Sequence, residues 1–136
     1  MPRKKAEPQP PSFQWISNDT TTGPYITIDG MRRFYLSSGT RELFNEAKSL
    51  IFGYDPVNKR LVVAKPDIVR AVNVKPYSFD KRWYSSARNF VAQASIDVAD
   101  LPLRFVFAGK DYADTPDGSY VFTLEDYDAP DGGIAE

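Results

Sequence analysis

The chain has 136 residues, of which 42% are hydrophobic and 14% aromatic, which suits one domain with a modest core. It contains neither cysteine nor histidine, so disulfides, thiolate metal sites and histidine bases are excluded, and we expect no enzyme, metal site or cofactor. The net charge of −1 hides an asymmetry, because residues 13–112 carry 14 basic and 10 acidic side chains, whereas residues 113–136 carry seven acidic and no basic ones.

The first residues, 1–12, are rich in proline and charge, which predicts a disordered basic tail. No apolar run in the chain approaches the roughly 20 residues that a membrane span requires. The basic start is not followed by the apolar segment of a secretory signal. We therefore expect a cytoplasmic protein without a membrane partner.

Residues 13–66 are predicted to form a first unit, in which regular secondary structure begins with "YITIDGMRRFYLS". Its apolar alternation and Asp29-Gly30 predict two strands joined by a two-residue turn. In the second of these strands Phe34 should face the core, whereas Arg33 and Tyr35 lie side by side on the outside.

A short helix follows in "SSGTRELFNEAK", with Ser38 as its N-cap. The stretch "SLIFGYDPVNKRLVVAKP" then predicts a second hairpin, which turns at "DPVNK". The first unit thus has the order strand, strand, helix, strand, strand.

Residues 67–124 are predicted to repeat that order. A strand around "VNVKPYSF" is edged by Pro76, and Ser86 caps a helix that carries Phe90. The strands "LRFVFAG" and "SYVFTLED" close the unit.

"RRFYLSS" and "KRWYSS" stand at the same point of the two units, which predicts an internal duplication. We therefore expect an α+β, β-rich fold in which two strand-strand-helix-strand-strand pseudo-repeats form one compact barrel.

The stretch "RRFYLSSGTRELFN" (residues 32–45) resembles the signature of AbrB/MazE-type swapped-hairpin DNA-binding domains. The chain departs from that signature where Arg32, Ser37 and Asn45 replace a glycine, a proline and a glycine. The likeness covers residues 25–66 and, more weakly, 72–124. It implies a barrel in which hairpins interleave, built here by one chain with a tandem copy.

The resemblance implies DNA contacts through Arg33 and Arg41, with Arg82 and Arg88 at the matching places of the second copy. Arginines neutralise phosphate, and the tyrosines beside them, Tyr35 and Tyr84, can stack on a base or a sugar. We therefore expect a non-enzymatic DNA-binding protein, such as a small transcription regulator or accessory factor. Trp83 and Phe34 are expected in the core.

Two alternatives stay open. The basic and aromatic strands would also suit single-stranded nucleic acid, on which the rings would stack. A protein-interaction or structural module would use the same scaffold with a protein partner. Residues 125–136, an acidic tail predicted to be disordered, would bind such a partner or compete with nucleic acid for the basic face.

Overall fold

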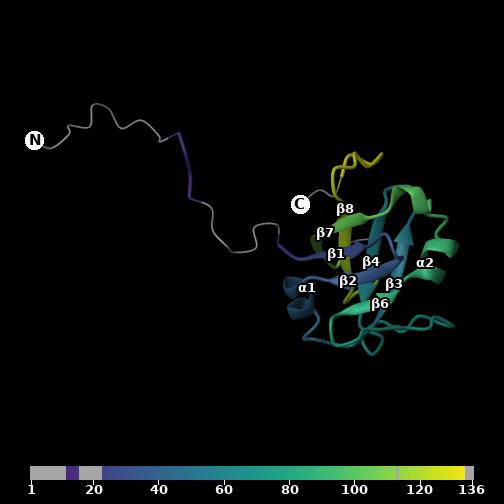
Figure 1. The fold of residues 1–136 in the computed structure, drawn as a ribbon. Coiled ribbons are helices and arrows are strands. Elements are labelled where there is room, and N and C mark those ends of the chain that lie inside the picture. Colours follow the sequence, from purple (N-terminus) through teal and green to yellow (C-terminus); the bar gives the residue numbers. More distant parts are fainter. Residues whose placement is uncertain (1–11, 16–22, 113, 134–136) are drawn as a thin grey trace, which may run out of the picture.

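The computed structural model describes residues 12–15, 23–112 and 114–133 (Figure 1). The first half of the fold comprises β1 (Tyr25–Ile28), β2 (Arg33–Leu36), α1 (Ser38–Leu43), β3 (Ser49–Asp55) and β4 (Arg60–Ala64). The second half comprises β5 (Tyr77–Ser78), β6 (Tyr84–Ser86), α2 (Arg88–Gln93), the 3-10 helix Val98–Asp100, β7 (Leu103–Lys110) and β8 (Tyr120–Leu124). The fold is therefore rich in strands, with few and short helices.

The strands form one antiparallel sheet in the order β5-β3-β4-β8-β7-β1-β2-β6, which curls into a nearly closed barrel (Figure 1). The two halves of the chain interleave in this sheet. β1 pairs with β7, β2 with β6, β3 with β5 and β4 with β8, so each of these four pairings joins residues 25–64 to residues 77–124. Within each half, β3–β4 and β7–β8 are paired hairpins.

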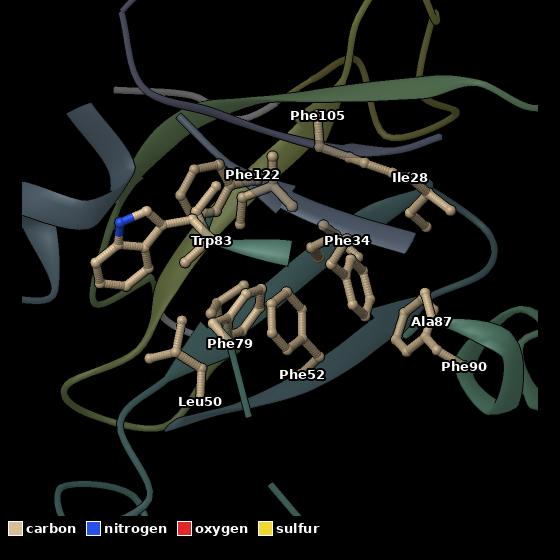
Figure 2. Packing of buried hydrophobic residues seen from close by; sticks show 14 of the residues in the cluster. Ile28, Phe34, Leu50, Phe52, Phe79, Trp83, Ala87, Phe90, Phe105 and Phe122 are labelled. Carbon is tan, nitrogen blue, oxygen red and sulfur yellow. The ribbon is translucent and has the colours of Figure 1, made fainter. Parts of the chain in front are cut away.

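The core is aromatic and lies inside the barrel (Figure 2). Phe34 is fully buried and stacks on Phe52 with 4.2 Å between the ring centroids, and Phe90 of α2 meets Phe34 edge-on at 5.0 Å. Trp83 is buried as well. Burying such large rings dominates the free energy of folding, since each removes well over 100 Å² of apolar surface from water. The alternation predicted for β2, with Phe34 inward and Arg33 and Tyr35 outward, is confirmed.

Three local predictions are wrong in detail. The first hairpin does not turn in two residues at Asp29-Gly30, because β1 ends at Ile28 and β2 begins at Arg33. The first helix is capped by Ser37 rather than Ser38. The second helix has Ala87 at its N-cap and no side-chain cap. The first turn is set by hydrogen bonds within residues 29–33, and the first helix cap by the bond from the Thr40 N–H to the Ser37 hydroxyl. At the second helix, the Ala87 N–H donates to the carbonyl of Arg32, which lies far away in the chain.

The strand expected around Pro76 is reduced to Tyr77–Ser78. Proline has no N–H to contribute to a ladder, so a strand that starts beyond it is short. At the ends of the chain, residues 1–11 of the predicted basic tail and residues 134–136 lie outside the described residues. No helix among the residues that the structure describes has the length and apolar character to cross a bilayer.

Candidate nucleic-acid interface

The outer face of the sheet carries a row of tyrosines across three neighbouring strands. Tyr35 on β2 is the register partner of Tyr84 on β6, and their ring centroids are 5.1 Å apart. Tyr25 on β1 lies 6.5 Å from Tyr35 on the other side. All three are partly exposed, since they alternate with core residues along their strands. We call Tyr25, Tyr35, Tyr84 and the arginines that contact them the tyrosine–arginine face.

Two arginines lie over the rings at the two ends of this row. The guanidinium carbon of Arg33 is 4.3 Å from the centroid of the Tyr84 ring, and that of Arg104 on β7 is 4.4 Å from the centroid of Tyr25. Both distances are within the range of a cation–π interaction. Each contact runs diagonally between adjacent strands, because Arg33 is paired with Ser86 and Arg104 with Thr27.

A third arginine reaches the row from α1. Arg41 donates from Nη2 to the Tyr35 hydroxyl at 2.8 Å and from Nε to the Leu36 carbonyl at 3.0 Å. Two hydrogen bonds hold the guanidinium beside the tyrosine. Among the described residues, no hydrogen bond engages the third guanidinium nitrogen, Nη1.

The helix that carries Arg41 is itself tied to β1. The Ser37 hydroxyl accepts from the Tyr25 N–H at 2.9 Å and from the Thr40 N–H at 3.3 Å. The Thr40 hydroxyl donates to the Tyr25 carbonyl at 2.7 Å. Ser37 and Thr40 are buried, so these bonds replace hydration that the two hydroxyls have lost. Arg41 and Tyr25 are thereby held in a fixed relation.

The charge of the tyrosine–arginine face is positive. Arg33 forms an ion pair with Asp29 at 2.8 Å, with 42% of the arginine side chain exposed. Among the residues that the structure describes, ion pairs engage Arg33 and Arg60 but neither Arg41 nor Arg104. Two full positive charges therefore remain on the face, with a third that is partly offset.

The two other predicted arginines are exposed residues of a turn and of α2. Arg82 is an exposed residue of the turn between β5 and β6, and Arg88 is the exposed first residue of α2. No contact joins either side chain to the tyrosine row in the described part of the chain. The structure thus brings together Arg33, Tyr35, Arg41 and Tyr84 of the six predicted residues.

The reason is a two-residue offset between the sequence motif and the structure. In the first hairpin the Asp29 N–H donates to the Arg33 carbonyl, and in the second the Asp80 N–H donates to the Tyr84 carbonyl. Each aspartate also accepts from the N–H two and four residues later. The turns are therefore equivalent, and Arg33 corresponds to Tyr84. The sequence match of "RRFYLSS" with "KRWYSS" had instead made Arg33 correspond to Arg82.

Trp83 occupies the left-handed position of the second turn, with a φ of 68°. Only 8% of the residue is exposed, as expected of a core residue. The Lys48 ammonium lies 3.6 Å from one of its ring centroids, and the Arg41 guanidinium carbon 5.4 Å away. These cations cover the ring. The buried Trp83 ring therefore contacts Arg41 and is not accessible for stacking with a nucleic-acid base.

Sequence reasoning missed two members of the face, Tyr25 and Arg104. Tyr25 could have been found, because it alternates with Ile26 and Ile28 and must lie on the same side as Tyr35. Arg104 gave no local signal. It reaches the face only because β7 pairs with β1, and that pairing joins residues some 80 positions apart in the chain.

The acidic segment after β8 packs against the outside of the β3–β4 hairpin. Asp131 forms a bidentate pair with Arg60, with Nη–Oδ distances of 2.6 and 2.7 Å. The Tyr127 hydroxyl donates to the Val57 carbonyl at 3.2 Å. The hydrogen bond from Arg60 holds the pKa of Asp131 below its ordinary value. Residues 125–133 of the predicted acidic tail thus make defined contacts with the barrel.

Comparison with family models, with curated proteins and with solved structures finds no match for this chain. The resemblance to AbrB/MazE-type domains stays a prediction.

Proposed function

We propose that the tyrosine–arginine face binds nucleic acid, with duplex DNA as the leading ligand, and that the protein is a non-enzymatic regulator or accessory factor. The observation that carries the proposal is the joining of three arginines to three partly exposed tyrosines on one outer face of the sheet. Arginine guanidinium groups neutralise phosphates, and this contact supplies most of the affinity in sequence-independent binding. Nucleic-acid binding is compatible with the predicted cytoplasmic location.

We also propose that the barrel is a tandem duplication that builds an AbrB/MazE-like pseudo-dimer. The equivalent turns at Asp29 and Asp80 and the exchanged strand pairings support this reading. In such a pseudo-dimer the second copy no longer repeats the first at the ligand-binding positions. Tyr84 stands where the first copy has Arg33, so one combined face replaces two separate ones.

The proposal is tested by fluorescence anisotropy of labelled duplex DNA between about 50 and 200 mM salt. Three phosphate contacts predict a log–log slope of the binding constant against salt of about −2.7. Arg104→Ala should lower the magnitude of that slope by about 0.9 and weaken binding to all sequences alike. Lys110→Ala is the matched control, because Lys110 ends the same strand at the far side from Arg104.

Salt-dependent binding that Arg104→Ala leaves unchanged would contradict this assignment of the face. Absence of duplex and single-strand binding at tens of micromolar protein would contradict a nucleic-acid function altogether. The thermal unfolding midpoint of each variant shows whether a loss of binding follows from a loss of fold.

Single-stranded nucleic acid is the second candidate ligand. It is favoured by the adjacent rings of Tyr35 and Tyr84, which are partly open to solvent. Stacking of one base on an aromatic side chain is worth about 1–3 kcal/mol. If stacking dominates, Tyr84→Ala should weaken single-strand binding by about fivefold or more, and single strands should bind more tightly than the duplex. The opposite preference would leave the duplex as the ligand.

A further inference from the structure

The barrel has an open seam between β5 and β6. The two strands are joined at their turn, where the Asp80 N–H donates to the Tyr84 carbonyl at 3.0 Å. Beyond the turn no residue of β5 is paired with one of β6. β5 pairs with β3 and β6 pairs with β2, so each of them has one paired edge and one open edge. The two open edges face the seam.

Peptide groups of two serines point into this seam. Across the β2–β6 pair, the Ala87 N–H donates to the Arg32 carbonyl and the Leu36 N–H donates to the Trp83 carbonyl. Ser86 therefore lies at a position that is not hydrogen-bonded to β2, and its own N–H and C=O groups face away from that strand. On β5 the Phe79 N–H donates to the Lys48 carbonyl, so the peptide groups of Ser78 face away from β3. An open strand edge of this kind is a template for another extended chain.

A groove of about 1050 Å³ lies over the seam. Phe52, Tyr77 and Phe90 contribute rings to its lining, and Asn89 and Gln93 of α2 form part of its polar rim. Lys75 is the one charged residue among those described as lining it. An aromatic floor, a neutral polar rim and open strand edges together suit an extended peptide with apolar side chains at alternate positions.

The chain itself contains such a peptide. Phe13 and Trp15 are exposed by 57% and 89%, and they are spaced so that both side chains fall on one face of an extended segment. Their rings already meet edge-on at 5.3 Å. Exposing a tryptophan almost fully leaves a large apolar area in water, which a binding partner would cover.

We propose that the groove over the β5–β6 seam binds the Phe13–Trp15 segment of a second copy of this chain as an added strand. The chain enters β1 on the side of the barrel away from α2 (Figure 1). The groove is lined in part by residues of α2. A second copy can present the segment without passing around the barrel. Two copies that exchange segments form a closed two-fold dimer, which needs no further subunit.

The proposal is tested by the mass of the full-length protein in solution between about 1 and 100 μM, measured by light scattering after gel filtration. The wild type should form a dimer as concentration rises, and Trp15→Ala should remain a monomer throughout that range. Val72→Ala is the matched control, because Val72 is 85% exposed and does not line the groove. That variant should dimerise like the wild type.

A second measurement shows that the groove is the receptor. A labelled peptide of residues 11–18 is titrated into the full-length Trp15→Ala protein, which lacks its own competing tryptophan. Saturable binding should be lost when Ser78→Lys is added at the seam, and the same peptide with alanine for tryptophan should not bind. The variants' circular dichroism spectra control for folding.

A wild type that stays monomeric at 100 μM would overturn the proposal, even if the peptide binds, because the segment would then dock within its own chain. A dimer that Trp15→Ala leaves intact would overturn it as well. Peptide binding that survives Ser78→Lys in a folded protein would place the receptor elsewhere. None of these outcomes depends on nucleic-acid binding.

Discussion

The hairpins β1–β2 and β5–β6 share one turn but differ in the pairing of their strands. Asp29 and Asp80 make the same set of hydrogen bonds to the backbone of their turns. β1 and β2 then pair over three residues each, whereas no residue of β5 is paired with one of β6. The paired hairpin carries Tyr25, Arg33 and Tyr35 of the tyrosine–arginine face on its outside. The open hairpin contributes Tyr84 to that face and also borders the groove.

The difference results from the strand sequences. β1 supplies Ile26 and Ile28, both fully buried, and it is paired on both sides. β5 begins just after Pro76 and is exposed at Ser78, so it has less apolar surface to bury between two neighbours. Phe90 of α2 instead packs against Tyr77 and Phe52. The same turn can therefore begin either a paired hairpin or an unpaired one, and the side chains of the strands decide which.

The largest expected contrast between the hairpins is in amide hydrogen exchange. The amide of Phe34 lies in a paired, buried strand and should exchange only when the barrel opens widely, whereas those of Ser78 and Ser86 face the seam. We expect exchange at the two serines to be at least about a thousandfold faster in dilute protein. Equal protection at the three amides would show that the seam is closed. Protection of the serines that grows with protein concentration would be the sign of an added strand.

A large effect on stability is expected at the centre of the β2–β6 pair, where Phe34 and Ser85 are register partners. Phe34→Ala removes a buried ring that stacks on Phe52 and should lower the free energy of unfolding by about 3–5 kcal/mol. Ser85→Ala, on the opposite strand, should change it by less than about 0.5 kcal/mol. Urea denaturation measures both. Similar losses for the two variants would contradict the account, in which Phe34 is a core residue and Ser85 is not.

Much of this contrast could not be read from the sequence. Alternation in "YITI" and "RFYL" predicted the inward and outward faces of β1 and β2, because period two is a local property. The two-residue offset between "RRFYLSS" and "KRWYSS" was missed, because their resemblance reflects composition. The match between the two turns depends on Asp29 and Asp80. Arg104 joins the face through a pairing between distant strands, which depends on topology and leaves no mark on neighbouring residues.

The smallest expected effect is at the turn aspartate of the open hairpin. The hydrogen bond from the Tyr84 N–H to Asp80 lowers the pKa of this carboxyl from its ordinary value of 3.8. A lowered pKa in the folded state means that the ionised form stabilises the fold above the ordinary value and that this contribution is lost as pH falls through the lowered pKa. Asp80→Asn should therefore be less stable than the wild type at pH 7, and the difference should shrink below about pH 4. A difference that is constant with pH would exclude the charge as its cause.

The most direct test of the central claim compares two double variants that each remove two arginines. Arg33→Ala/Arg104→Ala takes both from the tyrosine–arginine face, and Arg82→Ala/Arg88→Ala takes both from the surroundings of the open hairpin. Duplex affinity is measured by anisotropy across the same salt range. The account predicts that the first variant loses tenfold or more in affinity, with a slope smaller in magnitude by about 1.8, whereas the second changes affinity less than about threefold. Equal losses in the two variants, or a larger loss in the second, would contradict it.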